Sequence, residues 1–105
     1  INKQVAKLRK ENDILIFNQS RQCWKNPPDK WSNKGNDILF KGFADFIHNN
    51  KLDINIKLIC CEYGPEVDKS KSLIEELNIT KYVHWLPVIS RKEVFIVISY
   101  CDLGI

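Results

Sequence analysis

Strand-like and helix-like segments alternate along this chain, and that alternation restricts the possible folds more than any other feature. Apolar runs of strand length predict strands at residues 14–18, 54–61, 81–86 and 102–105. Helical spacing of apolar residues predicts helices between them, at residues 37–50, 66–77 and 90–100. Such a succession predicts an α/β fold, with a Rossmann-like parallel sheet and helices on both faces.

Two segments leave an alternative open. Residues 1–13 are predicted to be either a short helix or a linker arm. At residues 90–100, Ser90 and Glu93 have the spacing of a helix capping box, whereas the β-branched run "VFIVIS" favours a strand. We interpret residues 90–100 as a helix. In the helix at 37–50, the predicted buried face contains Leu39, Phe43, Phe46 and Ile47.

Length, charge and cysteine spacing limit the class of protein. The 105 residues suit one domain, and the formal charge of +3 is too small to indicate nucleic-acid binding. The cysteines at positions 23, 60, 61 and 101 lack the spacing of zinc ligands or of a disulfide framework, so we expect reduced cytosolic thiols. The apolar runs are far shorter than the ~20 residues that span a bilayer.

The connection at residues 19–36 is the strongest candidate site. In parallel sheets, ligands bind outside the carboxyl ends of the strands, where the strand order reverses. This connection carries several cations and a glycine at the expected start of the next helix: Arg21, Lys25, Lys30, Lys34 and Gly35. A helix start, a glycine and nearby cations are typical of an anion site, although a solvated loop with scattered cations is the alternative.

The aromatic and histidine side chains have mostly structural interpretations. Trp24 and Trp31 flank a Pro-Pro pair, and we expect both to pack the long loop onto the domain. Stacking on a base or sugar ring, or contact with a partner domain, is the alternative for these tryptophans. His84 lies in a predicted strand and His48 near a helix end, so neither is expected to be a catalytic base.

The order of several motifs resembles a known enzyme family. These are "SR…NKGNDILFKGFADFI", "IKLICCEYGPEVDKSKSLIEELNI" and "KYVHWLPVISRKEVFIVISYCDLGI", which together cover residues 14–105. Their succession is similar to the donor-binding half of a group 1 (family 4) glycosyltransferase. Such enzymes have the GT-B fold, in which two Rossmann-like domains face a cleft. The resemblance implies that residues 1–105 are a single nucleotide-sugar-binding domain, a fragment that is incomplete at its C-terminal end.

The resemblance also implies roles for particular residues. Arg21 and Lys34 would hold the diphosphate of a nucleoside-diphosphate sugar, with Gly35 beside them at the helix start. Gly64 would line the nucleotide site, and Val88 would contact the base. This chain departs from the family in the long insertion "QCWKNPPDKWSN", for which Lys25 is a candidate substitute for Arg21. The family's E-x7-E carboxylates would lie beyond Ile105.

The activity implied is transfer of a sugar to an acceptor hydroxyl with retention at the anomeric carbon, as in polysaccharide biosynthesis. In this fragment the catalytic contribution would be charge stabilisation by Arg21 and Lys34 alone, without a metal or another cofactor. The expected partners are the donor and an acceptor-binding N-terminal domain of the same parent chain, with no nucleic acid. The expected location is cytoplasmic, and peripheral association of the parent enzyme with the inner face of the membrane is compatible with it.

A different class of function remains open at this point. The chain would also suit a non-catalytic α/β ligand-binding or regulatory module. A phosphoacceptor module would need an acidic cluster at the strand ends, for which Glu62 and Asp102 are the candidates. The basic first connection argues against that interpretation. Nucleic-acid binding through the tryptophans and lysines is the third option, and it predicts a steep dependence on salt.

Overall fold

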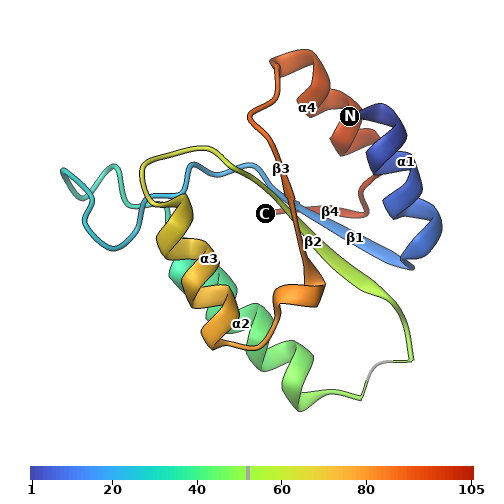
Figure 1. Ribbon diagram of the computed structural model, residues 1–105, viewed down its shortest axis with the longest axis horizontal. Coiled ribbons are helices and arrows are strands. Elements are labelled where there is room, and N and C mark those ends of the chain that lie inside the picture. Colours follow the sequence, from blue (N-terminus) through green and yellow to red (C-terminus); the bar gives the residue numbers. More distant parts are fainter. Residues whose placement is uncertain (52) are drawn as a thin grey trace.

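The computed structural model describes residues 1–51 and 53–105, in which helices and strands alternate as predicted (Figure 1). The helices are α1 (Asn2–Glu11), α2 (Asn36–Asn49), α3 (Val67–Glu76), α4 (Arg91–Tyr100) and the short 3-10 helix η1 (Thr80–Tyr82). The strands are β1 (Ile14–Asn18), β2 (Ile56–Cys61), β3 (Val83–Leu86) and β4 (Leu103–Gly104). The predicted α/β fold class is confirmed.

The strands of the described residues form one parallel sheet in the order β3-β2-β1-β4. Residue Ile16 of β1 lies opposite Leu58 of β2 on one side and opposite Leu103 of β4 on the other. The chain therefore adds β2 and β3 on one side of β1 and then crosses over to place β4 on the other side. This reversal next to β1 is the topological switch point of a Rossmann-like sheet, where ligands bind.

Helices cover both faces of the sheet (Figure 1). Helices α2 and α3 pack on one face, where Phe40 joins Leu58 and Cys60 in a buried cluster. Helices α1 and α4 pack on the other face, where Ile59 and Cys61 are buried. Side chains alternate between the faces of a strand, so the neighbouring cysteines point to opposite sides. All the cysteines are free in the described chain, and burial raises the pKa of the Cys60 thiol.

Helix α4 confirms the helical interpretation of residues 90–100. The Ser90 hydroxyl accepts a hydrogen bond from the Glu93 N–H (3.2 Å), and Glu93 Oε1 accepts one from the Ser90 N–H (2.9 Å). This capping box satisfies N–H groups that have no partner within the helix. The β-branched run follows the box and places Val97 fully inside the second core cluster. Capping and burial together therefore outweigh the β propensity of the run.

The N-terminal segment is a helix and not a linker arm. Val5 and Leu8 of α1 are buried against the sheet face that α4 also covers. The guanidinium of Arg9 donates to the carbonyl of Tyr100 (3.0 Å) and to Asp102 Oδ2 (2.7 Å). Arg9 thus ties α1 to the end of α4 and to the start of β4.

One predicted helix face and the predicted starts of two strands differ from the structure. In α2 the buried apolar residues are Phe40, Phe43, Ala44 and Ile47, whereas Phe46 is exposed. The buried set has the spacing i, i+3, i+4, i+7, and Phe46 lies about 100° around the helix from Ile47. Strands β2 and β3 begin at Ile56 and Val83, each two positions later than predicted, and the 3-10 helix η1 directly precedes β3.

Candidate functional site

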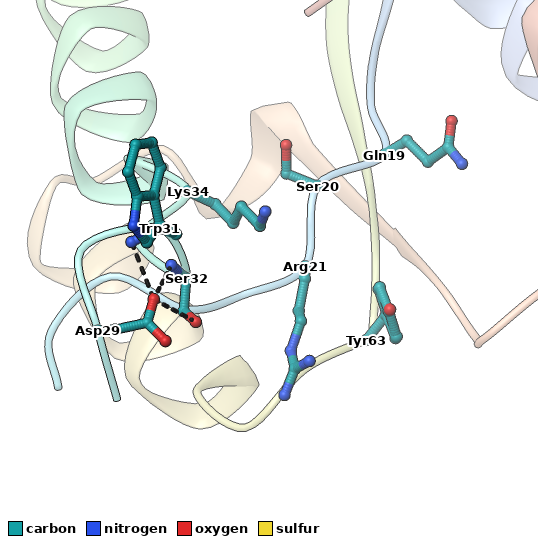
Figure 2. A pocket seen from close by; sticks show the side chains of 8 residues that line it. All are labelled: Gln19, Ser20, Arg21, Asp29, Trp31, Ser32, Lys34 and Tyr63. Atoms are coloured by element: carbon teal, nitrogen blue, oxygen red, sulfur yellow. Dashed lines mark hydrogen bonds between the residues drawn. The ribbon is translucent and has the colours of Figure 1, made fainter. Parts of the chain in front are cut away.

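A cavity of about 590 Å³ opens at the carboxyl end of β1, between the first connection (residues 19–35) and the turn after β2 (Figure 2). Its lining side chains are polar, charged or aromatic: Gln19, Ser20, Arg21, Asp29, Trp31, Ser32, Lys34 and Tyr63. Because β1 borders the reversal in strand order, this cavity lies where a Rossmann-like sheet is expected to bind a ligand.

The two cations predicted to bind phosphate both line this cavity. Arg21 and Lys34 are exposed, and neither forms an ion pair within residues 1–51 and 53–105. Figure 2 shows the Lys34 amine extending toward Ser20, whereas the Arg21 guanidinium points away from Lys34. The two charges therefore occupy separate parts of the cavity wall. A ligand that contacts both must extend across the cavity.

Asp29 is the carboxylate of this cavity, and the loop itself uses one of its oxygens. Oδ1 accepts hydrogen bonds from the N–H groups of Trp31 (2.9 Å) and Ser32 (2.9 Å) and from the Ser32 hydroxyl (3.1 Å). These bonds set the shape of the loop tip. With Arg21 and Lys34 against this one carboxylate, positive charge is in excess along the described lining, which suits an anion.

Glu66, the residue before α3, holds the first connection against the domain. Its Oε1 accepts hydrogen bonds from the backbone N–H groups of Trp24 (2.6 Å) and Lys25 (2.9 Å), and its Oε2 accepts one from Asn26 (3.0 Å). The Glu66 residue is only 4% exposed. Sequence reasoning assigned Glu66 only to the start of a helix, because its partners lie about forty residues earlier in the chain.

The surroundings of Glu66 favour its ionised form. Burial by itself would raise the pKa of this carboxyl group, but the N–H groups of Trp24, Lys25 and Asn26 outweigh burial, with help from the Lys69 ammonium. The net result is a pKa below the ordinary glutamate value of 4.5. Glu66 therefore contributes to stability as an anion.

Trp24 packs the base of the loop down, as predicted, whereas Trp31 does not. The Trp24 indole N–H donates to the Ser70 hydroxyl (2.9 Å), which donates to Gln22 Oε1 (2.7 Å). Gln22 and Ser70 are fully buried. Trp31 lies at the loop tip and is 79% exposed, so the expectation that it packs against the domain is wrong. The hydrogen bonds of Asp29 shape the loop around Trp31, which lines the cavity.

Gly35 lies at the start of α2, as predicted, and its backbone is left-handed (φ 65°). The Gly35 N–H donates to Asn33 Oδ1 (2.8 Å), and a Cβ at position 35 would meet no atom within 4 Å. In the described part of the chain no side chain caps α2, so the N–H groups of its first turn lack a side-chain acceptor. Gly35 is not a lining residue of the cavity, but its neighbour Lys34 is.

Gly64 has a packing role that the sequence resemblance does not imply. Its φ is 110°, and a Cβ there would lie 2.6 Å from the Gln22 nitrogen and 2.8 Å from Arg21 Cγ. Around it, the Gln22 N–H donates to the Tyr63 carbonyl (2.8 Å), and the Glu66 N–H donates to the Gln22 carbonyl (3.0 Å). Gly64 thus lets the two loops meet, while Tyr63 is the residue of this turn that lines the cavity.

Replacing Gly64 with alanine is expected to lower the free energy of unfolding by roughly 3 kcal/mol, because the side chain would collide with backbone at an unfavourable φ. Urea denaturation followed by circular dichroism measures this loss. The control is Gly42→Ala, in α2, where a Cβ meets nothing within 4 Å. That variant should gain about 0.5–1 kcal/mol from helix propensity. Equal stability of the two variants would contradict the proposed role of Gly64.

A second cavity, of about 330 Å³, adjoins the first at Gln19 and Tyr63, which line both. Its other lining residues come from the end of β2, from the segment after β3 and from α4: Cys61, Val88, Ile89, Arg91 and Val94. Val88, predicted to contact a base, is 67% exposed here. The cationic cavity and this more apolar one therefore meet along the carboxyl edge of the sheet.

Lys25 lies apart from the cationic cavity. It lines a different groove beside α3, together with Trp24 and Lys69. The structure therefore gives no support to Lys25 as a substitute for Arg21. Gln19 and Tyr63, which sequence reasoning did not select, line the cavity instead. Gln19 follows β1 directly and Tyr63 lies close after β2, and these positions are the sequence signal by which both could have been predicted.

The acidic pair needed by a phosphoacceptor does not form. Glu62 follows β2 and pairs with Lys71 (2.9 Å). Asp102 precedes β4 and accepts a hydrogen bond from the Leu15 N–H (2.9 Å). The two carboxylates therefore lie at opposite ends of parallel strands, which excludes a cluster between them.

The histidines contact groups outside the cavity. His84 Nε2 lies 2.7 Å from Gln4 Nε2, and His48 Nε2 lies 2.7 Å from the Leu77 carbonyl oxygen. Burial and the nearby Lys57 ammonium lower the pKa of His84. Within residues 1–51 and 53–105, no group of His, Cys, Asp and Glu side chains is arranged to hold a metal ion.

No protein-family model matches this chain, and no curated protein matches it. Among the helices that the structure describes, none has the length and apolar character to cross a membrane. The chemistry of the two adjoining cavities is therefore the basis for assigning a function.

Proposed function

We propose that this chain is the donor-binding part of a retaining glycosyltransferase and that it binds a nucleoside-diphosphate sugar. The observation that carries the proposal is that Arg21 and Lys34 line one cavity at the carboxyl end of β1. A diphosphate suits this wall because arginine offers a planar fork of donors and lysine a mobile point charge. The resemblance of the ordered motifs to group 1 glycosyltransferases supports the same assignment.

The two cations would act on the leaving group. In the transfer, the bond between the anomeric carbon and the diphosphate oxygen breaks, the acceptor oxygen bonds to that carbon, and the acceptor proton passes to an oxygen of the departing diphosphate. Negative charge therefore grows on the departing diphosphate. Arg21, Lys34 and the uncapped N–H groups of α2 would stabilise this charge electrostatically. We therefore propose that donor binding needs no metal ion.

The second cavity is assigned to the base of the donor. It adjoins the cationic cavity at Gln19 and Tyr63, so a diphosphate bound beside Arg21 has a base-sized space next to it. Exposed Val88 and the partly buried Ile89 offer apolar contact to a flat ring. The turn at Gly64 supports this site indirectly, by holding Tyr63 and Arg21 together.

The acceptor site is assigned to a separate N-terminal domain of the parent chain, at the cytoplasmic face of the membrane. In the described residues, the carboxylate of the cationic cavity is Asp29, and its Oδ1 is engaged by the loop. We therefore expect the isolated chain to bind the donor without transferring sugar. The same observation favours the second candidate, a ligand-binding module with no catalytic role. Sugar transfer by the parent enzyme distinguishes the two.

Isothermal titration calorimetry of the chain tests the proposal. Inorganic pyrophosphate, UDP and GDP are expected to bind. UDP and GDP should each bind at least tenfold more tightly than uridine and guanosine, because the cations contact the phosphates. A short DNA single strand should bind weakly. Nucleic-acid binding would instead give tight binding of the strand, with a steep loss of affinity as salt rises. Absence of pyrophosphate and nucleotide binding would refute the proposed donor site.

A further inference from the structure

Trp31 is the large apolar residue with the highest exposed fraction among the described residues, and it lines the cationic cavity. Its side chain is 79% exposed, next to a wall that carries Arg21 and Lys34. Figure 2 shows the indole at the loop tip, among the side chains that line this cavity with Lys34. An exposed indole loses the free energy that burial would provide, so its place at a polar cavity needs an explanation other than packing.

The loop holds this indole in a defined place. The backbone N–H of Trp31 donates to Asp29 Oδ1 (2.9 Å), which also accepts hydrogen bonds from the N–H and the hydroxyl of Ser32. The Lys30 ammonium lies over the ring, 5.0 Å from its centroid, in a cation–π contact. One face of this exposed indole therefore meets a cation, and we expect a ligand to use the other face. A ring preorganised in this way loses little conformational entropy when a ligand stacks on it.

The order of residues along the carboxyl edge indicates which part of a ligand reaches Trp31. Val88 lines the second cavity only, Trp31 lines the cationic cavity only, and Gln19 lies between them as a residue of both. In Figure 2, Arg21 and the Lys34 amine lie between Gln19 and Trp31. If the base lies at Val88 and the diphosphate at Arg21 and Lys34, the group beyond the diphosphate is therefore the one that meets Trp31. In a nucleoside-diphosphate sugar that group is the sugar.

We propose that Trp31 is a stacking platform for the sugar ring of the donor, an inference that rests on the proposed function. A pyranose in a chair form presents a face made largely of C–H bonds, and that face packs on the electron-rich face of an indole. The hydroxyl groups at the ring edge remain free to contact Ser32, which lines the same cavity. Trp31 thereby contributes to recognition of the sugar, separately from the phosphates.

The variant Trp31→Ala tests this role by calorimetry with inorganic pyrophosphate, UDP, GDP, UDP-glucose and GDP-mannose. We expect the variant to bind a nucleotide sugar about tenfold more weakly, whereas pyrophosphate, UDP and GDP change less than twofold. Trp31→Phe, which keeps an aromatic face, should recover most of the affinity. The control is Phe95→Ala on α4, another exposed aromatic residue that lies outside both cavities and should change no affinity.

The outcomes separate this inference from the proposed function. Normal pyrophosphate binding with no selective loss of nucleotide-sugar affinity would overturn the role of Trp31 and leave the donor site standing. An equal loss for nucleotides with and without the sugar would place the base at Trp31 and overturn the sugar assignment. A loss for pyrophosphate as well would indicate that Trp31 only shapes the loop. If the wild-type chain binds none of these ligands, both proposals fail.

Discussion

Replacing Lys34 with alanine is expected to weaken binding of pyrophosphate and nucleoside diphosphates by about thirtyfold, the effect of losing a charged hydrogen bond of about 2 kcal/mol. Lys34 lines the cationic cavity without an ion-pair partner in the described chain, so its charge is available to a ligand. In the glycosyltransferase that we propose as the parent of this chain, the same change should lower turnover on the order of a hundredfold, because the charge on the leaving diphosphate would lose stabilisation. Calorimetry and steady-state kinetics measure the two effects.

Lys25 provides the matched control for Lys34. It belongs to the same loop and is also exposed, but it lines the groove beside α3. Lys25→Ala should therefore leave the affinity for diphosphates within about twofold of wild type. Lys34→Arg, which keeps the positive charge, should retain part of the wild-type affinity. Equal losses for Lys25→Ala and Lys34→Ala would mean that only the overall charge of the loop matters. The proposed site at Lys34 would then be wrong.

Replacing Glu66 with alanine is expected to lower the free energy of unfolding by about 3 kcal/mol at pH 7, since buried hydrogen bonds to a charged group are lost. The N–H groups of Trp24, Lys25 and Asn26 would lose their shared acceptor. For a domain of this size the melting temperature should fall by roughly 15 °C. Thermal and urea denaturation measure the change, and Glu75→Gln, an exposed position on α3, should stay within about 0.5 kcal/mol of wild type.

The pH dependence provides a second check on Glu66. The pKa of Glu66 in the folded chain lies below the ordinary value of 4.5. Between these two pKa values, Glu66 binds more protons in the unfolded chain than in the folded chain. The stabilisation is therefore complete above about pH 4.5 and is lost as the pH falls through the folded-state pKa. The difference in unfolding free energy between wild type and Glu66→Ala should narrow at pH 3. A difference that stays constant from pH 7 to pH 3 would contradict the ionic role of Glu66.

Part of the candidate site was predictable from the chain itself. Arg21, Lys34 and Gly35 follow a buried strand and precede a helix, and both cations do line the cavity at the carboxyl end of β1. Cations near a helix start are a local pattern, so neighbours in sequence are enough to find them. Gln19 and Tyr63 lie at the same edge of the sheet, but their residue types carry no comparable signal.

The different environments of Trp24 and Trp31 were not predictable. Both flank the same Pro-Pro pair, yet Trp24 bonds to buried Ser70 while Trp31 remains exposed at the cavity. The difference depends on Glu66, which holds the base of the loop from about forty residues further along the chain. A contact between residues so far apart in the chain cannot be predicted from the spacing of neighbouring residues.

The sequence by itself determined the α/β class, the succession of elements and the cationic character of the first connection. These properties follow from apolar periodicity, capping residues and local charge, which act over a few residues. Only the tertiary structure decided the strand order β3-β2-β1-β4, the meeting of the two cavities and the exposure of Trp31. Those features depend on strand pairing and burial between segments that are distant in sequence. Such contacts stabilise the chain only once the whole sheet and its loops are assembled.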